Sequence, residues 1–458
     1  MLMLCLVTGC ILNTVHAQVL SLKDAEQTAL NNYNAIKAKS NYANASKASF
    51  VQTKRDALPN LVVSAQQDYG TINGQNGPAY GFGGFGVASS GLPLASQNWH
   101  SAFGGLYLAN INWDFFAFGR VKERVKAAES VVNRDENDLK QEQFQHQVRV
   151  ASAYLNLLAA QRISRSLQNN LNRADTFRLA VTARAKNGLI AGVDSSLANA
   201  EVSNAKIVLL RAIDAEQERA NELALLMGLA GTQQFNLDTL FITRIPSSVL
   251  DSAAIIEHHP VLEFYKSRIN VSDQQAKYFS TLQYPVFSLF SVFQTRGSGF
   301  SSGYATNQSD YTQKYYDGIK PVRSNYLLGL GVTWNLTTPL RVHQQLTAQK
   351  FISSALKNEY DLANQQITAQ QTLAFSKMKN AVAAYSEAPV QVKAASDAFL
   401  QKTVLYRNGL TTIVDVTQAL YALTRAETDR DIAYNNVWQA LLLKAAAAGD
   451  FGIFLNEL

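Results

Sequence analysis

The sequence is poor in cysteine, in charge and in long apolar runs. Asp, Glu, Lys and Arg make up only 17% of its 458 residues, against about 25% in typical soluble domains. The only cysteines are Cys5 and Cys10, so the rest of the chain can form neither a disulfide nor a thiolate site. No uncharged apolar run approaches the ~20 residues that a membrane-spanning helix needs, which excludes a polytopic helical membrane protein.

Signatures of enzymes and of nucleic-acid binding are also missing. The formal net charge of +6 is small for this length, and no cluster of five or more Lys or Arg residues occurs, so nucleic acid is not an expected partner. The sequence has no nucleophile–His–acid spacing and no phosphate-binding glycine loop, so we expect neither an enzyme nor a cofactor. The pair His258-His259 precedes Pro260 at a predicted helix start without a third ligand, which favours a structural role over a metal site.

The first residues are typical of a targeting segment. Residues 1–17 are predicted to be a secretory signal peptide, with the small-x-small cleavage site Val15-His16-Ala17. An alternative is that Val7-Thr8-Gly9-Cys10 is a lipobox, in which case Cys10 would carry a lipid. The charged region that normally begins a signal peptide is missing.

Two halves of the chain share motifs at a constant offset. Asn187-Gly188-Leu189 recurs as Asn408-Gly409-Leu410, and the same offset of 221 residues relates Trp113 to Trp334. We interpret this as a tandem duplication, because such self-similarity marks repeated structural units. The predicted segments are a first repeat at 18–230, a connecting segment at 231–256, a second repeat at 257–448 and a C-terminal tail at 449–458.

Each repeat is predicted to contain a helix, two strands, a very long helix and a return helix. Residues 119–186 lack proline, and one heptad position is almost entirely apolar or small from Val125 to Val181, which indicates coiled-coil packing. The second long helix contains Pro389, which is expected to kink or interrupt it. The predicted helices lie near 21–57, 119–186, 194–228, 257–284, 341–407 and 415–447.

The strands alternate between apolar and polar residues, as in Tyr107, Ala109, Ile111 and Trp113. Strands of ~9–11 residues with one apolar face fit a transmembrane barrel, and a soluble sandwich with one solvated face has the same alternation. The segment 70–105 contains ten of the 25 glycines. It and the segment 296–325 are predicted to be long extracellular loops.

Four strands cannot close a sheet, and a bilayer does not tolerate open sheet edges. Several chains must therefore share one barrel. Two chains would give eight strands with a filled interior, and three would give twelve strands around a lumen. The long helix would extend ~100 Å, so it must project from the membrane on the side opposite the loops.

The run from Tyr406 to Val416, with Asn408-Gly409-Leu410 at its centre, resembles the helix-turn-helix tip of the TolC-like outer membrane efflux proteins. The duplicated layout resembles them as well. The resemblance implies an α+β membrane protein, in which a trimeric 12-stranded outer-membrane β-barrel, four strands per chain, continues as a long α-helical coiled-coil barrel in the periplasm.

The resemblance also implies a function. The protein would be the outer membrane channel of a tripartite efflux pump, in contact with outer membrane lipid, a periplasmic adaptor protein and an inner-membrane RND or ABC transporter. The alternatives are a type I protein secretion conduit, a trimeric coiled-coil surface protein, and an outer-membrane hydrolase, for which no Ser/His/acid set is found.

The resemblance further implies two sets of site residues. Asp194 and Asp415 would lie at the periplasmic gate, where three copies of Asp415 would form a carboxylate ring, or they would be N-caps of the return helices. Gln418 stands where relatives often carry a second acid, and Tyr406 could donate a hydrogen bond to Asp194. Thr411 replaces an arginine that locks the tip in relatives. The expected adaptor-docking tips are Asn187, Gly188, Leu189, Asn408, Gly409 and Leu410.

Overall fold

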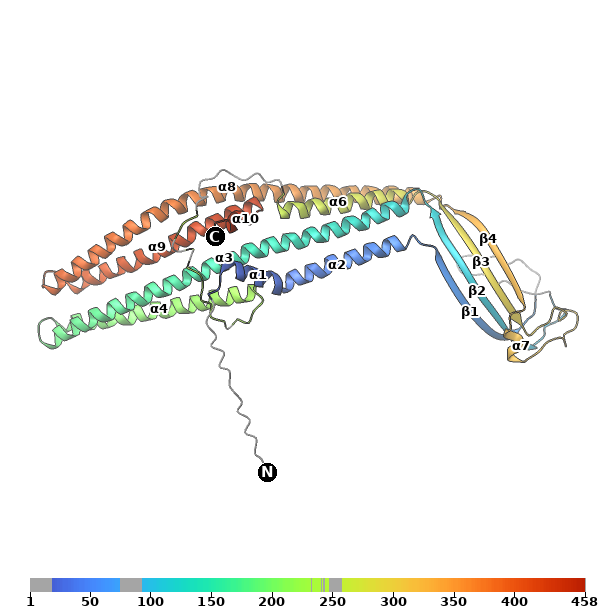
Figure 1. Cartoon of the computed structure of the whole chain (residues 1–458), viewed down its shortest axis with the longest axis horizontal. Coiled ribbons are helices and arrows are strands. Elements are labelled where there is room, and N and C mark those ends of the chain that lie inside the picture. Colours follow the sequence, from blue (N-terminus) through green and yellow to red (C-terminus); the bar gives the residue numbers. More distant parts are fainter. Residues whose placement is uncertain are drawn as a thin grey trace, which may run out of the picture. The chain divides into compact units, whose positions relative to one another are not determined.

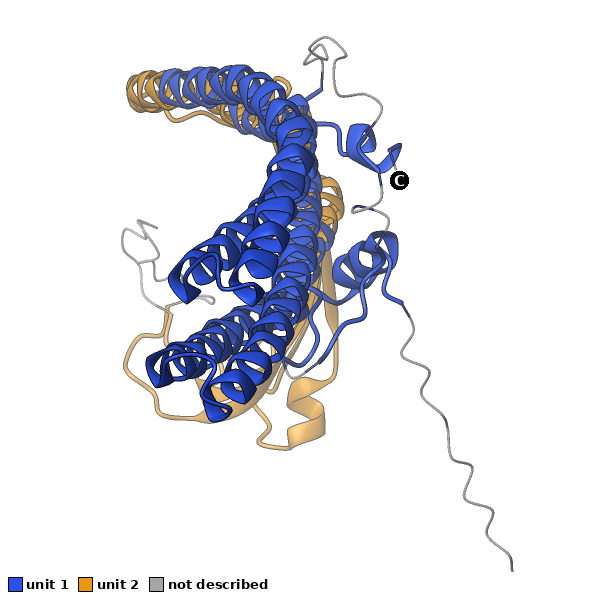
Figure 2. Ribbon diagram, turned by 90° about the vertical axis from the view of Figure 1, so that its left-hand side faces the viewer, with its two compact units in different colours: residues 1–45, 132–269, 354–458 blue, residues 46–131, 270–353 orange. Residues whose placement is uncertain are grey.

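The computed structural model describes residues 19–74, 93–231, 233–239, 241, 244–246 and 258–457. The chain forms two compact units, which Figure 2 shows in different colours. Unit 1 comprises residues 1–45, 132–269 and 354–458, and unit 2 comprises residues 46–131 and 270–353. Each unit therefore takes segments from both halves of the sequence. The predicted signal peptide, the lipobox cysteine and much of the connecting segment lie outside the described residues.

Unit 2 is built on a four-stranded antiparallel sheet with the strand order β1-β2-β3-β4 (Figure 1). The strands are rich in β-branched and aromatic residues, which suit a pleated surface. They have 11 to 16 residues and are longer than the sequence predicted. Their bounds are β1 Asn60–Thr71, β2 Ser101–Phe116, β3 Val286–Ser298 and β4 Arg323–Thr333.

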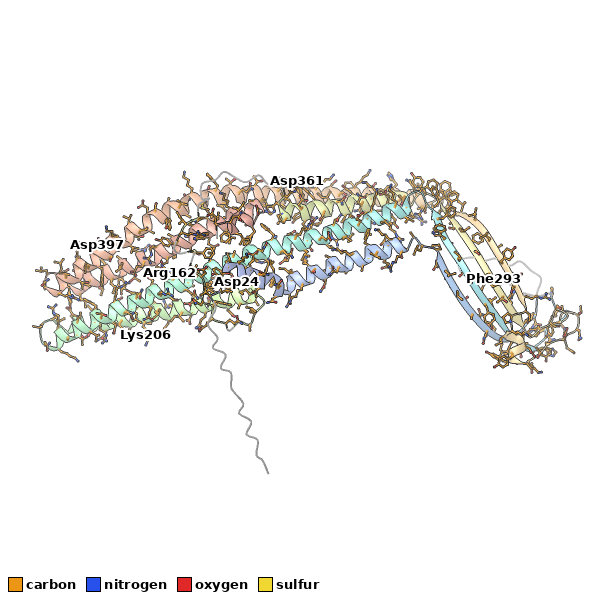
Figure 3. All side chains as sticks on the ribbon, in the orientation of Figure 1. Asp24, Arg162, Lys206, Phe293, Asp361 and Asp397 are labelled. Atoms are coloured by element: carbon orange, nitrogen blue, oxygen red, sulfur yellow. The ribbon has the colours of Figure 1, made fainter. Side chains whose placement is uncertain are left out.

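The register leaves one face of the sheet mostly apolar and puts all strand charges on the other, which we call the polar face although it also carries apolar residues such as Phe290 and Val292. Val63, Ala109, Phe293 and Tyr326 form one row of paired residues across the sheet, so their side chains project on the same side; Phe293 is labelled in Figure 3. The apolar face carries Leu61, Val63, Tyr107, Ile111, Trp113, Leu289, Phe293, Tyr326, Leu328 and Leu330. All four charged residues of the strands lie on the opposite face: Asp68, Asp114, Arg296 and Arg323.

The strands extend into both segments that were predicted to be loops, 70–105 and 296–325, so the loops are shorter than predicted. Ser101 to Gly105 belong to β2, and the second loop contains the short helix α7 (Tyr315–Ile319). The glycines were read as loop residues, but two of them make room for the chain around α7. A Cβ on Gly105 would come within 2.9 Å of Ile319 O, and one on Gly297 within 2.4 Å of Lys320 O.

A tryptophan near the end of the second strand of each half makes the same hydrogen bond. Trp113 Nε1 donates to Ala57 O at 3.0 Å, and Trp334 Nε1 donates to Gln283 O at 3.1 Å. In each case the carbonyl lies just after the helix that precedes the first strand of that half. A duplicated unit would produce this recurrence, and the duplication itself stays a proposal.

The helices lie within a few residues of their predicted positions, with two differences. The predicted helix 21–57 is two helices, separated at Tyr33, which has extended backbone angles (φ −67°, ψ 120°). Pro389 lies inside α8, which continues past it; of the two predicted effects, the interruption is wrong and the kink stays a prediction. The bounds are α1 Leu22–Asn32, α2 Asn34–Arg55, α3 Arg120–Lys186, α4 Gly192–Leu226, α6 Pro260–Thr281, α8 Thr338–Arg407, α9 Ile413–Ala448 and α10 Gly452–Leu455.

Across the described part of the chain, the helices are either too short or too polar to cross a membrane. The predicted heptad position of α3 faces inward, since none of its nine residues is exposed and Ala153, Ala174 and Val181 are buried.

The main core of unit 1 lies among α1, α3, α4, α8, α9 and α10, with Leu237 and Phe241 from the segment after α4. Its largest fully buried side chains include Trp438 and Phe454. Phe454 belongs to α10, so the predicted C-terminal tail, 449–458, contributes to the core. Its ring lies 6.0 Å from the Trp438 ring and 6.4 Å from the Phe241 ring, measured between centroids.

We expect Phe454→Ala to lower the free energy of unfolding by about 3–5 kcal/mol, because it opens a cavity beneath Trp438. Thermal and denaturant unfolding of the detergent-solubilised protein measures this change. His258→Ala is the control, since the His258 side chain is 85% exposed, and surface changes of this kind alter stability by about 0.5 kcal/mol or less. Equal effects of the two substitutions would show that α10 is not part of the core.

Candidate functional site

The ends of the two helical hairpins of unit 1 share one backbone geometry. The α3–α4 hairpin turns at Gly188 (φ 71°) and the α8–α9 hairpin at Gly409 (φ 75°), a left-handed conformation that favours glycine. The amide of the leucine that follows each glycine donates to a carbonyl five residues earlier, at 2.9 Å in both turns. Leu189 and Leu410 are 66% and 72% exposed. All six predicted tip residues are exposed: Asn187, Gly188, Leu189, Asn408, Gly409 and Leu410.

The two aspartates behind the tips are not N-caps, so that alternative is corrected. The N-cap of α4 is Ala191, and the N-cap of α9 is Thr412. Asp194 and Asp415 each occupy the third helical position. A carboxylate there is stabilised by the positive end of the helix dipole without being the capping residue.

The carboxylate of Asp415 is bound within its own turn. It accepts hydrogen bonds from Thr411 Oγ1 at 2.7 Å and from the Thr412 amide at 3.2 Å, and Lys402 Nζ lies 3.6 Å away. Thr412 and Asp415 together form a capping box. The Thr411 hydrogen bond, followed by those from Thr412, holds the pKa of Asp415 well below its usual range. Asp415 is therefore ionised at any physiological pH.

The carboxylate of Asp194 bonds to the other hairpin instead. Its N-cap residue, Ala191, has no side-chain group that could bind it. Tyr406 Oη donates a hydrogen bond to Asp194 Oδ2 at 2.9 Å, as the sequence allowed. Tyr406 is 5% exposed, and burial, followed by the bond to Asp194, raises the pKa of Tyr406 to about 12. The hydroxyl therefore stays protonated, and it joins α8 to α4.

Arg184 makes a second connection between the hairpins, which the sequence reasoning missed. Its Nη1 donates to Arg407 O at 3.0 Å and to Tyr406 O at 3.3 Å. Both carbonyls lie at the end of α8, where intrahelical hydrogen bonds run out; Tyr406 O also accepts from the Gly409 amide at 3.1 Å. A basic residue in the last turn of a helix is a known capping signal, but its target on another hairpin cannot be read from the sequence. Arg184 thus joins the two hairpins close to their tips.

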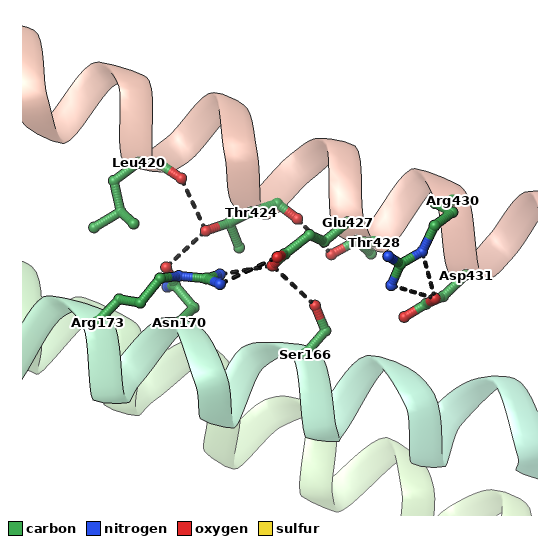
Figure 4. A network of polar contacts seen from close by, with 9 residues as sticks. All are labelled: Ser166, Asn170, Arg173, Leu420, Thr424, Glu427, Thr428, Arg430 and Asp431. Carbon is green, nitrogen blue, oxygen red and sulfur yellow. Dashed lines mark hydrogen bonds and ion pairs between the residues drawn. The ribbon is translucent and has the colours of Figure 1, made fainter. Parts of the chain in front are cut away.

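Further polar contacts join α3 to α9 behind the tips (Figure 4). Arg173 donates to both oxygens of Glu427, at 3.1 and 2.6 Å, and Ser166 Oγ lies 3.3 Å from the same carboxylate. Thr424 Oγ1 donates to Asn170 Oδ1 at 2.7 Å. The bidentate geometry makes the Arg173–Glu427 pair the most specific contact of this set.

Two buried carboxylates extend this polar network. Asp431, 5% exposed, pairs with Arg430 at 2.9 Å and with Arg162 at 3.5 Å. Glu201 on α4, 6% exposed, accepts a hydrogen bond from Tyr421 on α9. Burial raises the pKa of Glu201, and the bond to Glu201, followed by burial, raises the pKa of Tyr421 to about 12. Polar contacts therefore join the hairpins at several levels.

The remaining predicted residues lie apart from this network. Gln418 is exposed, three residues beyond Asp415 on α9. The rings of His258 and His259 do not converge, because His258 is 85% exposed whereas His259 is 4% exposed with Nε2 3.2 Å from Ala446 O. Within the residues that the structure describes, no group of three or more His, Cys, Asp or Glu side chains could hold a metal ion.

Residues 25–229 match the model of the outer membrane efflux protein family. Three solved structures share the fold over most of the chain. The outer membrane protein VceC from Vibrio cholerae is 17% identical, with a TM-score of 0.74 over 94% of this chain and 96% of that one. The CmeC channel of Campylobacter jejuni is 14% identical (TM-score 0.72, coverage 93% and 85%), and the MtrE channel of Neisseria gonorrhoeae is 15% identical (TM-score 0.72, coverage 94% and 89%). No curated protein sequence matches the chain.

The fold is thus that of an outer-membrane channel subunit, with α+β content and long helices. The predicted resemblance to the TolC-like outer membrane efflux proteins is confirmed. The matched family and the three solved structures are outer membrane channel proteins, which agrees with the predicted location and with the assignment as a non-enzyme.

Glu201→Gln should make the protein more stable at pH 7. Burial raises the pKa of Glu201 above its ordinary value of 4.5, so the folded chain binds this proton more tightly than the unfolded chain does. The stability that this group contributes is therefore fully present below pH 4.5 and is lost as the pH rises through the raised pKa. Glutamine can still accept the Tyr421 hydrogen bond, but it carries no buried charge.

Melting temperatures at pH 7 and pH 4 measure this effect. The Glu201→Gln protein should melt higher than the wild type at pH 7, and the difference should shrink towards pH 4. Glu222→Gln is the control, because Glu222 is exposed and pairs only with its neighbour Arg219, so its effect should be small at both values. A wild type that melts higher than Glu201→Gln at pH 7 would contradict the argument.

Proposed function

We propose that the chain is one protomer of a homotrimeric outer membrane channel that acts as the exit duct of a tripartite efflux pump. The sheet of unit 2 is the observation that supports this most. One face is apolar, all four strand charges lie on the other face, and β1 and β4 each pair with a single strand within the described residues. These are the properties of a barrel wall with lipid on one side and an aqueous lumen on the other.

Closure of the sheet supports a trimer. The unpaired edges of β1 and β4 would be satisfied if β1 of one chain paired with β4 of the next. Two chains would form an eight-stranded barrel with an interior filled by side chains, whereas three would form twelve strands around an open lumen. A conduit requires the lumen, so the trimer with a 12-stranded barrel is the arrangement that we propose.

The helices of unit 1 would continue this conduit in the periplasm. The tips formed by Asn187-Gly188-Leu189 and Asn408-Gly409-Leu410 would then number six per trimer, each with an exposed leucine. Such a ring of similar tips would suit a ring of periplasmic adaptor subunits. We propose that the adaptor docks there and links the channel to an inner-membrane RND or ABC transporter.

Two other functions use parts of the same architecture. A type I secretion conduit would have the same trimer and the same tips, and would differ in the transporter that supplies the substrate. A trimeric coiled-coil surface protein would need the helices but no lumen. The polar sheet face favours a channel over that structural role, because a surface stalk has no use for a wall with one polar and one apolar side.

We propose that the gate consists of Asp194, Tyr406, Asp415 and Gln418 at the periplasmic end of the helices. The Tyr406–Asp194 hydrogen bond of 2.9 Å would hold the tip closed, and Arg184 would assist by binding the end of α8. Three copies of Asp415 would place ionised carboxylates around a narrow mouth, as in cation-channel constrictions. With Gln418 in place of a second acid, this ring would carry one charge per chain.

Single-channel recording and native mass measurement test the proposed assembly. We expect the purified mature protein to be a trimer in detergent and to conduct ions in planar bilayers with a low resting conductance. Tyr406→Phe should raise the resting conductance, because it removes the hydrogen bond to Asp194 and keeps the ring in its pocket. A stable monomer, or a trimer without conductance, would contradict the proposal.

Asp415→Asn separates the gate role from the capping role. If three Asp415 carboxylates surround the mouth, the substitution should reduce cation preference and weaken block by multivalent cations. Thr412→Ala is the matched control, because it removes the capping hydroxyl at a cost of about 0.5–2 kcal/mol and keeps the carboxylate. Recordings and melting temperatures of both variants distinguish the two roles. If both melt lower and neither changes ion selectivity, Asp415 acts only in the cap.

A further inference from the structure

On the polar face of the sheet, two arginines lie directly opposite each other on adjacent strands. Arg296 on β3 is paired with Arg323 on β4, and the same row contains Leu106 and Gln66. The row lies at the end of the sheet near α7, since the chain passes from β3 through α7 to β4 just beyond it. Arginines therefore provide the only charge in this row.

No direct partner within the described residues compensates the positive charges of these two arginines. Both arginines are exposed, and neither forms an ion pair or a side-chain hydrogen bond with another described residue. The acids of the same face do not lie beside them, because Asp68 is on β1, with β2 between it and β3, and Asp114 is paired with Ser288, eight positions before Arg296 on β3. Like charges placed directly opposite each other on adjacent strands repel. An anion bound between them would turn this repulsion into attraction.

We propose that Arg296 and Arg323 form an anion-binding site that takes carboxylate or phosphate groups. Two guanidinium forks side by side present several N–H donors, which match the oxygens of such groups in a bidentate manner. The inference deepens the proposed function and rests on it: in the proposed barrel, the polar face lines the lumen, so the bound group would belong to a molecule on its way out. The class of substrate that this site recognises is anionic.

A trimer would place three such pairs around the lumen, on the side of the extracellular loops. Charges of one sign that line a narrow passage raise the local concentration of the opposite ion. The two ends of the channel would then differ in selectivity, with carboxylates at the helical tips and guanidinium groups at the exit. The exit would favour anions regardless of the state of the tips.

Block and binding by tripolyphosphate test the site. We expect tripolyphosphate added on the loop side of a planar bilayer to block the wild-type channel, and calorimetry to detect its binding to the solubilised protein. Arg296→Gln with Arg323→Gln should weaken both at least about tenfold, since each lost charged hydrogen bond is worth about that factor. The same variant should become less anion-permeable in a salt gradient. Lysine at both positions should keep the ion preference and weaken block by a smaller factor.

Arg211→Gln is the matched control, since it removes one charge from an exposed residue of α4 outside the sheet and should change neither measurement. If the double variant Arg296→Gln with Arg323→Gln does not assemble, the double lysine variant and the single variants Arg296→Gln and Arg323→Gln replace it in the test. Unchanged block, binding and selectivity in these variants would overturn the inference. Binding only to vesicles that contain anionic lipid headgroups would overturn it too, because the arginines would then face the membrane. Tripolyphosphate binding by a protein that does not conduct would instead refute the channel and leave the site standing.

Discussion

The structure depends on the unpaired backbone groups at the two edges of the sheet. Within the described residues, β1 and β4 each pair on one side only, so in a single chain each has a row of amide and carbonyl groups without a strand partner. In hydrocarbon these groups cannot be left unsatisfied. In the barrel that we propose, neighbouring chains would supply these partners. Phe293 and Arg296, which lie on opposite faces of the sheet, would then face lipid and lumen respectively.

The contacts between the helical hairpins change in kind along the helices. The buried core of unit 1 is apolar around Trp438, but towards the tips α3 and α9 are joined by side-chain hydrogen bonds and ion pairs such as Arg173–Glu427. Apolar contacts are non-directional, whereas these contacts depend on exact geometry. A tip held by a few directional bonds can be released when those bonds break, without loss of the core behind it.

Periodicity in the sequence predicted much of the fold. It failed where the structure depends on contacts between residues that are far apart in the sequence. The heptad position from Val125 to Val181 and the strand alternation repeat locally, so the long helices and the two sheet faces followed from them. The start of β2 was missed because Gly104 and Gly105 resemble loop residues until β1 and the chain around α7 cover them. The partners of Arg184 were missed because no local pattern records which carbonyls of another hairpin it meets.

The two tips illustrate how one backbone can serve two purposes. Both turns have the same glycine geometry, and both return helices carry an aspartate at the third position. The difference lies in the two residues before the helix, because Thr411 and Thr412 donate hydroxyl hydrogen bonds to Asp415 whereas Ile190 and Ala191 have no such group for Asp194. The missing hydroxyls leave the Asp194 carboxylate free to accept the bond from Tyr406. The side chains just before each return helix therefore influence whether the acid is bound within its own turn or joins two hairpins.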